Sequence, residues 1–256
     1  MITSLEAIVL GIIEGITEFL PISSTGHLII SSNLLGIAPT DFLKTFEISI
    51  QLGAIFSVIF LYRKKLTSDL EIWKKIIVGF IPTGIIGLIF YKFIKQFLGN
   101  TEIVIWSLAL GGLALIIFEL LHKEKNNSLE NLEKITYKKS IAIGFFQSIA
   151  IIPGVSRSAA TILGGLLLGL HRKTIVEFSF LLAIPTMAAA TGFDLLKNAP
   201  SFSSNQFFVL LIGFVTSFIV AIFSIKFLLK FIEKNNFIGF GIYRLLIALV
   251  FWILII

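Results

Sequence analysis

Six runs of mostly apolar residues place the strongest constraint on how this chain can fold. They lie at about 45–62, 76–94, 103–121, 176–196, 207–231 and 239–256. A helix of about 20 such residues crosses the apolar core of a bilayer. Only 14% of the residues are charged and the mean hydropathy is +0.98, whereas about 25% of a soluble domain is charged. The sequence therefore predicts an all-α integral membrane protein with six full spans.

Two further apolar segments, at about 5–35 and 140–170, are interrupted by proline, glycine, serine and charged residues. Each is expected to form a broken re-entrant hairpin, in which two short helices enter and leave on the same side of the membrane. Irregular backbone at membrane depth is tolerated only where protein or a water-filled cavity covers it. The two hairpins are therefore expected to lie inside the protein, where they form its functional centre.

The two hairpins look like copies of one unit. A shift of 133 residues aligns Gly11 with Gly144, Glu14 with Gln147, Ser23 with Ser156, and Thr25 with Ser158. Each copy is followed by three spans, and an odd number of spans reverses the orientation of the second copy. The sequence therefore predicts one membrane domain, 1–256, built from inverted repeats at about 1–125 and 138–256, with the site where the hairpins meet.

The distribution of lysine and arginine predicts the orientation. Fourteen of these cations fall on one predicted side: Arg63, Lys64, Lys65, Lys74, Lys75, Lys123, Lys125, Lys134, Lys138, Lys139, Arg172, Lys173, Lys230 and Lys234. Four fall on the other: Lys44, Lys92, Lys95 and Lys197. Cytoplasmic loops carry the excess of positive charge, so the first hairpin is expected to open outward. This pattern also accounts for the net charge of +6 without nucleic acid. Cysteine is absent, which excludes disulfides and thiolate metal sites.

The first hairpin contains the motif Glu14-Gly-Ile-Thr-Glu-Phe-Leu-Pro-Ile-Ser-Ser-Thr-Gly-His27. Glu14 and Glu18 are four residues apart and share one face of a helix. Like charges at this spacing repel each other, and a low dielectric strengthens the repulsion. The pair therefore needs a positive partner, which a metal ion, a proton or a cationic side chain can supply.

The second half of this motif predicts a break and a new helix. Pro21 ends the first helix, and Ser23 or Ser24 can cap the helix that follows. The start of a helix presents free N–H groups and a positive dipole end to an anion such as phosphate. Ser24 is a candidate nucleophile or phosphate donor, and His27 is a candidate for proton chemistry, with capping as the structural alternative.

The second hairpin breaks at Pro153-Gly-Val-Ser-Arg-Ser-Ala-Ala-Thr161. Ser156 can cap the following helix, and Arg157 is a permanent cation at membrane depth. Such a charge marks a functional site by default, and its planar fork matches phosphate oxygens. Two other charges inside spans, Glu119 and Arg244, are expected to pair with each other.

These two motifs, at these positions, resemble the membrane undecaprenyl-diphosphate phosphatases, also called bacitracin-resistance proteins, over essentially the whole chain. The resemblance implies hydrolysis of the terminal phosphate of undecaprenyl diphosphate in the bacterial inner membrane, which recycles the lipid carrier for peptidoglycan synthesis. It also implies a divalent cation, magnesium or calcium, and a site open toward the outer face. The lipid and the bilayer are the expected partners, and a homodimer is one candidate assembly.

The resemblance also implies roles for individual residues. Catalytic roles fall to Glu18, Ser24, His27 and Arg157, metal binding to Glu14 and Glu18, and substrate binding to Ser23, Gly154, Ser156, Arg157 and Thr161. It leaves open whether serine, histidine or an activated water attacks the phosphorus. Architecture alone favours a rival, a transporter or flippase of an anionic prenyl lipid. The combination of two glutamates, a serine and a histidine favours catalysis, because transport needs no such set.

Overall fold

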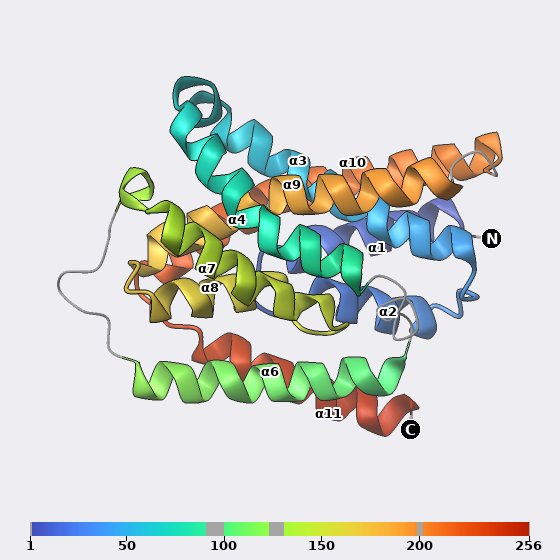
Figure 1. The fold of residues 1–256 in the computed structure, drawn as a ribbon. Coiled ribbons are helices and arrows are strands. Elements are labelled where there is room, and N and C mark those ends of the chain that lie inside the picture. Colours follow the sequence, from blue (N-terminus) through green and yellow to red (C-terminus); the bar gives the residue numbers. More distant parts are fainter. Residues whose placement is uncertain (1, 91–99, 123–130, 199–201, 256) are drawn as a thin grey trace.

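The computed structural model describes residues 2–90, 100–122, 131–198 and 202–255, which are helical without any strand (Figure 1). Five of the helices are long and apolar enough to cross a membrane. They are α3 (Asp41–Ser68), α4 (Leu70–Ile89), α6 (Thr101–Leu121), α9 (Arg172–Asn198) and α10 (Ser204–Ile232). The sixth predicted run forms α11 (Ile238–Ile255), an apolar helix shorter than these five. The length and position of α11 match the sixth predicted run, and the prediction of an all-α membrane protein is confirmed.

Both interrupted segments form pairs of short helices. The first pair is α1 (Ser4–Thr17) and α2 (Ser24–Leu34), and the second is α7 (Tyr137–Ser148) and α8 (Arg157–Leu167), with the short 3₁₀ helix η2 (Ile149–Ile151) between them. In Figure 1, α1 and α7 begin at opposite ends of the molecule and run toward its middle. There the chain turns back in each hairpin. The turns occupy 18–23 and 152–156, and these two segments are called the hairpin tips below.

Local sequence signals explain where the hairpins begin and turn. Thr3 and Glu6 form a capping box at the start of α1, and the Thr136 side chain caps α7. At the tips, Ser23 caps α2 and Ser156 caps α8, as the sequence predicted. Gly154 has a φ of +89°, a conformation that favours glycine. The helix breaks are thus encoded locally.

Helix pairing is related between the two halves. The helix α1 packs on α10, while α7 packs on α4; α3 packs on α9, and α6 on α11. Both hairpin contacts use glycine at the aligned positions: a Cβ on Gly11 would lie 2.8 Å from the Gly213 carbonyl oxygen, and one on Gly144 would lie 2.0 Å from that of Gly79. Small residues allow membrane helices to approach this closely. These pairings are the ones that two repeats would produce, and the repeat boundaries stay a prediction.

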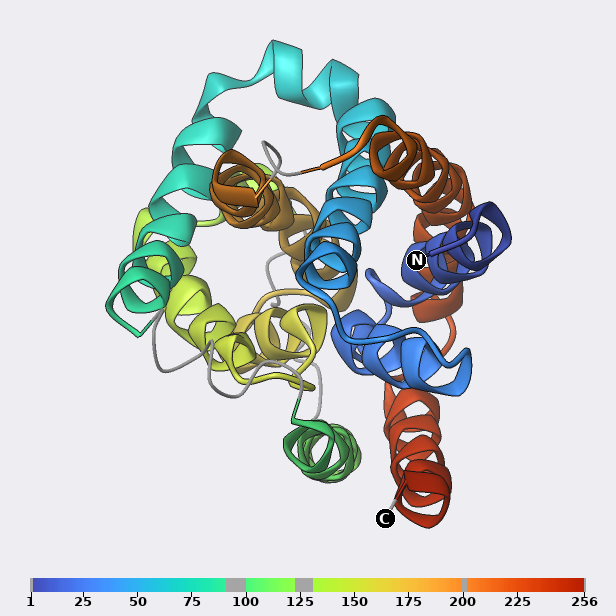
Figure 2. The ribbon, with the colours of Figure 1, turned by 90° about the vertical axis from the view of Figure 1, so that its right-hand side faces the viewer.

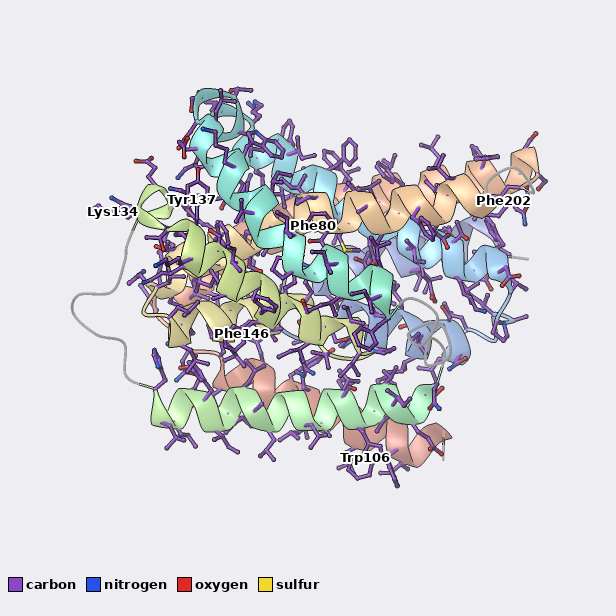
Figure 3. The ribbon with its side chains drawn as sticks, viewed as in Figure 1. Phe80, Trp106, Lys134, Tyr137, Phe146 and Phe202 are labelled. Atoms are coloured by element: carbon purple, nitrogen blue, oxygen red, sulfur yellow. The ribbon has the colours of Figure 1, made fainter. Side chains whose placement is uncertain are left out.

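The α6–α11 pair forms one side of the molecule. Viewed along the helices in Figure 2, these two lie below the ring formed by the others. Many apolar side chains point away from the protein, including Trp106 on α6, which is 54% exposed (Figure 3). Such an outer surface suits contact with lipid. Lys134 and Phe202 lie at opposite ends of the molecule in the same view.

The absence of native cysteine makes the orientation directly testable. Lys64→Cys and Lys234→Cys place exposed thiols at the end predicted to be cytoplasmic, and Ala38→Cys and Ser204→Cys place exposed thiols at the opposite end. A membrane-impermeant thiol reagent added to intact cells should label only the last two variants, whereas permeabilised cells should give labelling of all four. The reverse pattern in intact cells would overturn the orientation predicted from charge.

The predicted pairing of Glu119 with Arg244 is wrong. Glu119 on α6 accepts hydrogen bonds from both terminal nitrogens of Arg172 and from the Phe237 backbone N–H at 3.0 Å. Through these hydrogen bonds, Glu119 links the starts of α9 and α11 to the end of α6. Arg244 instead lies among backbone carbonyls at the hairpin tips. The sequence could not distinguish these partners, because all of them are more than 50 residues away from Glu119.

Candidate active site

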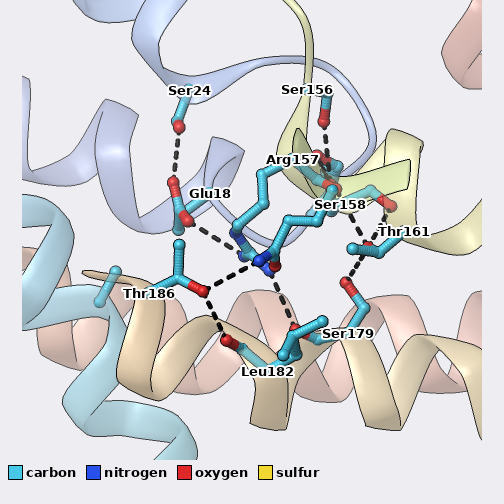
Figure 4. Close-up of polar contacts among 12 residues, drawn as sticks. Glu18, Ser24, Ser156, Arg157, Ser158, Thr161, Ser179, Leu182 and Thr186 are labelled. Atoms are coloured by element: carbon cyan, nitrogen blue, oxygen red, sulfur yellow. Dashed lines mark hydrogen bonds and ion pairs between the residues drawn. The ribbon is translucent and has the colours of Figure 1, made fainter. Parts of the chain in front are cut away.

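The two hairpin tips meet through an ion pair. Arg157, the first residue of α8, donates from Nη2 to Oε1 of Glu18 at 3.1 Å (Figure 4). The two side chains are only 11% and 5% exposed. The first hairpin contains no lysine or arginine, and the second contains no aspartate or glutamate. Each of these two charges therefore finds its oppositely charged partner in the other hairpin. Arg157 is therefore the positive partner of Glu18, one of the two carboxylates of the pair.

Glu18 also accepts a hydrogen bond from Ser24. The Ser24 hydroxyl lies 2.5 Å from Oε2 of Glu18, on the other oxygen from the one that binds Arg157 (Figure 4). Both residues are buried. A short hydrogen bond from a hydroxyl to a carboxylate is a strong one. Glu18 is thus placed to accept the Ser24 proton, while Arg157 balances its charge.

Glu14 lies one helical turn before Glu18 and is fully buried. Among the residues that the structure describes, no hydrogen-bond donor reaches either of its carboxylate oxygens. A buried carboxylate without a partner is costly. This position therefore fits a bound cation or proton, which is the role that the sequence analysis predicted for it.

Arg157 retains donors that the protein does not use. Its guanidinium has five N–H groups, of which Nη2 binds Glu18 and Nη1 binds the Ser179 carbonyl at 2.9 Å. The Nε–H is buried and has no acceptor within the described residues. A buried donor without an acceptor is unfavourable unless a ligand satisfies it. The free N–H groups are suited to an anion with two oxygens, such as phosphate.

The remaining predicted residues of the second hairpin are mostly engaged within the protein. Ser156 accepts from the Ala159 N–H at 3.2 Å and lies 3.0 Å from the Ser158 hydroxyl. Ser158 donates to the Leu20 carbonyl at 2.9 Å, which ties the two tips together. Thr161 is fully buried and shares a 2.6 Å hydrogen bond with Ser179. Its predicted role in phosphate binding stays a prediction.

Ser23 and His27 form the other side of the first tip. Ser23 has a φ of +73°, the one positive value outside glycine in the described chain, and such strain is characteristic of functional sites. Its carbonyl lies 2.7 Å from Nδ1 of His27, whose Nε2 lies 2.9 Å from the Tyr243 hydroxyl. Tyr243 belongs to α11, so this helix also contributes to the site.

Arg244, next to Tyr243, clamps both tips. Its fully buried guanidinium donates to the carbonyls of Pro21 at 3.3 Å and Gly154 at 3.2 Å, one in each tip. It also donates to the carbonyls of Ser107 at 2.8 Å and Leu108 at 3.2 Å on α6. A buried cation must be hydrogen bonded in this way to be tolerated. The clamp keeps the two tips, and with them Glu18 and Arg157, in register.

The sequence analysis missed three residues that contribute to the site: Ser158, Ser179 and Tyr243. Ser158 was noted only as the partner of Thr25 in the repeat. Ser179 and Tyr243 lie inside long apolar spans, where a single polar residue predicts nothing about its neighbours. The one available signal for Tyr243 was its position next to Arg244, a charge within a span.

Glu14 and Glu18 are the two carboxylates near the first tip that could hold a divalent cation. Glu14 offers two oxygens without donors, and Glu18 lies one turn away. No group of three or more histidine, cysteine, aspartate or glutamate side chains is arranged as a metal site in the described parts of the chain. Magnesium commonly binds one or two carboxylates and takes its other ligands from phosphates and water. Glu14 and Glu18 fit that kind of site.

The fold and the site together define a multi-pass α-helical membrane protein whose two buried hairpin tips join an acidic motif to an arginine with free donors. A family model described as bacitracin resistance protein BacA matches residues 7–250. This chain belongs to that family, and the family resemblance predicted from the two motifs is confirmed.

Named relatives agree with this result over nearly the whole chain. An undecaprenyl-diphosphatase of Sulfurihydrogenibium sp. (strain YO3AOP1) is 54% identical over 251 residues, which cover 98% of this chain and 99% of that protein. Those of Aquifex aeolicus (strain VF5) and Persephonella marina (strain DSM 14350 / EX-H1) are 55% and 53% identical, over 97% and 96% of this chain and 97% of each relative.

Proposed function

We propose that this chain is an undecaprenyl-diphosphatase, a hydrolase that removes the terminal phosphate of undecaprenyl diphosphate and leaves undecaprenyl phosphate. The product returns to the cycle that carries peptidoglycan precursors. The family membership supports this function, since the relatives compared above are undecaprenyl-diphosphatases. The structural observation that carries it is the meeting of Ser24, Glu18 and Arg157, because one contact network holds a hydroxyl, a carboxylate acceptor and a phosphate-binding cation.

Arg157 and the start of α8 would bind the diphosphate. The free guanidinium N–H groups can bond two phosphate oxygens at once. Arg157 is the first residue of α8, so the same tip also offers the positive end of the helix dipole to an anion. In a buried site, these donors stabilise the charge on the transferring phosphoryl group more than they would in water.

Ser24 is the attacking group that the contacts favour. In this mechanism its oxygen bonds to the terminal phosphorus, its proton passes to Glu18, and the bond to the bridging oxygen breaks to release undecaprenyl phosphate. Water then attacks the phosphoserine, and Glu18 returns its proton to the Ser24 oxygen as the Ser24–phosphorus bond breaks. One hydrogen of the water stays on inorganic phosphate, and the other is released to solvent. The alternatives are attack by Nε2 of His27 and direct attack by water, both of which use the same phosphate donors.

Release of inorganic phosphate from a prenyl diphosphate by the purified protein in detergent tests this function. We expect the wild type to release one inorganic phosphate for each prenyl diphosphate consumed. The Ser24→Ala variant should release it at a small fraction of the wild-type rate. A transporter or flippase would release none. Neither the family match nor the named relatives support that rival.

We propose that a divalent cation, magnesium or calcium, binds at Glu14 and Glu18. When bound, it would neutralise charge on the diphosphate. Chelation should abolish phosphate release, and added divalent cation should restore it. Glu14→Gln, which keeps the shape of the side chain but removes its charge, should shift the cation dependence to higher concentration. Full activity of the wild type in chelator would remove the cation from this mechanism.

The bacterial inner membrane is the proposed location, with the site open toward the outer face as the charge distribution predicts. The prenyl tail would stay in lipid, so only the head group needs to reach the tips. The homodimer also stays a proposal. Light scattering of the detergent-solubilised protein would measure the mass of the assembly.

A further inference from the structure

The helix α11 brings two consecutive polar side chains to the hairpin tips. Arg244 is fixed there by four backbone carbonyls, as described above. Its neighbour Tyr243 places its hydroxyl 2.9 Å from Nε2 of His27, 216 residues away in sequence. The Tyr243 and His27 rings are nearly parallel, with an interplanar angle of 4° and centroids 5.6 Å apart. The clamp made by Arg244 therefore also determines where the Tyr243 hydroxyl lies.

The partners of His27 determine which of its nitrogens carries the hydrogen. Nδ1 lies 2.7 Å from the Ser23 carbonyl, which can only accept a hydrogen bond. Nδ1 must therefore be the donor in a neutral ring, and Nε2 must be the acceptor. The Tyr243 hydroxyl then donates to Nε2. Both nitrogens of the buried ring are therefore satisfied, and the electron pair of Nε2 is the one that accepts from Tyr243.

The role of the Tyr243 hydroxyl differs from that of its ring. The residue is 37% exposed, whereas Arg244 beside it is fully buried. A phenylalanine at this position would keep the ring and its contacts. The hydroxyl is therefore the part of the side chain that bears on His27, and its removal is a defined test.

We propose that Tyr243 is a positioning residue for His27: its hydroxyl holds the neutral imidazole in the tautomer in which Nε2 is the proton-accepting nitrogen. The proposal rests on the proposed function, because it assigns His27 a part in phosphate release. Partners that orient metal-ligating histidines contribute about 10–100-fold to affinity or activity, and we expect an effect of the same order here. The contact itself can be tested without activity.

The kinetic test compares Tyr243→Phe with wild type in the phosphate-release assay. We expect kcat to fall by about 10-fold or more, with KM within about twofold, because the substrate contacts are left in place. Tyr137→Phe is the matched control: it removes a tyrosine hydroxyl that donates to Glu71 at an exposed position, and it should keep the wild-type rate. A wild-type kcat for Tyr243→Phe would overturn the proposal.

A double variant separates positioning from general damage. If Tyr243 acts through His27, Tyr243→Phe should have no further effect on the residual rate of His27→Gln. An equal fall in both backgrounds would show that Tyr243 acts independently of His27 and would overturn the proposal.

A spectroscopic test detects the contact whether or not the protein is a phosphatase. The chain has three histidines, so a sample labelled with ¹⁵N in the imidazole rings gives few signals, and His27→Gln assigns those of His27. Tyr243→Phe should move the Nε2 signal of His27 and leave those of His122 and His171 in place. An unmoved His27 signal would overturn the inferred contact. Failure of the wild type to release phosphate, with the signal shift present, would instead identify the proposed function as wrong.

Discussion

Replacing Arg157 with lysine should lower turnover by at least about 100-fold while the protein still inserts and folds. Lysine keeps the positive charge near Glu18 but offers a point donor on a flexible stem in place of a planar fork. The guanidinium in this structure uses Nη1 and Nη2 for the protein and leaves Nε–H without an acceptor in the described chain. Loss of one preorganised donor to a transition state costs about 10²–10³ in rate.

The measurement is the initial rate on a prenyl diphosphate in detergent, at saturating divalent cation, for wild type, Arg157→Lys and Arg157→Ala. If Arg157 clamps phosphate, the lysine variant should be nearly as slow as the alanine variant. If Arg157 only balances the carboxylates, lysine should restore most of the rate. A lysine variant within about threefold of wild type, a difference of under 1 kcal/mol, would contradict the clamp.

The second large effect is expected for Glu18→Gln. Glutamine keeps the shape of the side chain, but its amide cannot accept the Ser24 proton, and it no longer balances the charge of Arg157. A positioned proton acceptor contributes about 10²–10⁴ to a rate, so turnover should fall by at least about 100-fold. Breaking a buried ion pair on one side costs about 3–5 kcal/mol of stability. Thermal unfolding in detergent should therefore occur at a lower temperature.

Glu177→Gln is the control for that experiment. Glu177, on α9, is partly buried, and its charge interacts with Lys65 and Lys173, not with the residues of the hairpin tips. Its amide variant should keep a rate within about threefold of wild type. Equal losses in the two variants would mean that the effect at Glu18 reflects a general cost of neutralising buried carboxylates, and would contradict its role as proton acceptor.

Much of the site could be read from the sequence because its signals are local. The apolar runs fixed the number and approximate position of the helices. Pro21 and Gly154 identified the breaks. Proline lacks the N–H that a continuing helix needs, and glycine allows the positive φ that a turn can require. Ser23 and Ser156 cap the helices that follow, as predicted. The paired glutamates and Arg157 were recognisable because charges are costly inside apolar segments.

The partners of these charges were decided by the tertiary structure. Arg157 pairs with Glu18 across 139 residues, and Arg244 binds carbonyls of both tips where a pairing with Glu119 was predicted. Tyr243 reaches His27 across 216 residues. A buried polar group must find a partner wherever the folded chain provides one. The sequence alone therefore determined which residues needed partners, and helix packing decided which ones they obtained, because hydrogen bonds depend on distances in space of about 3 Å.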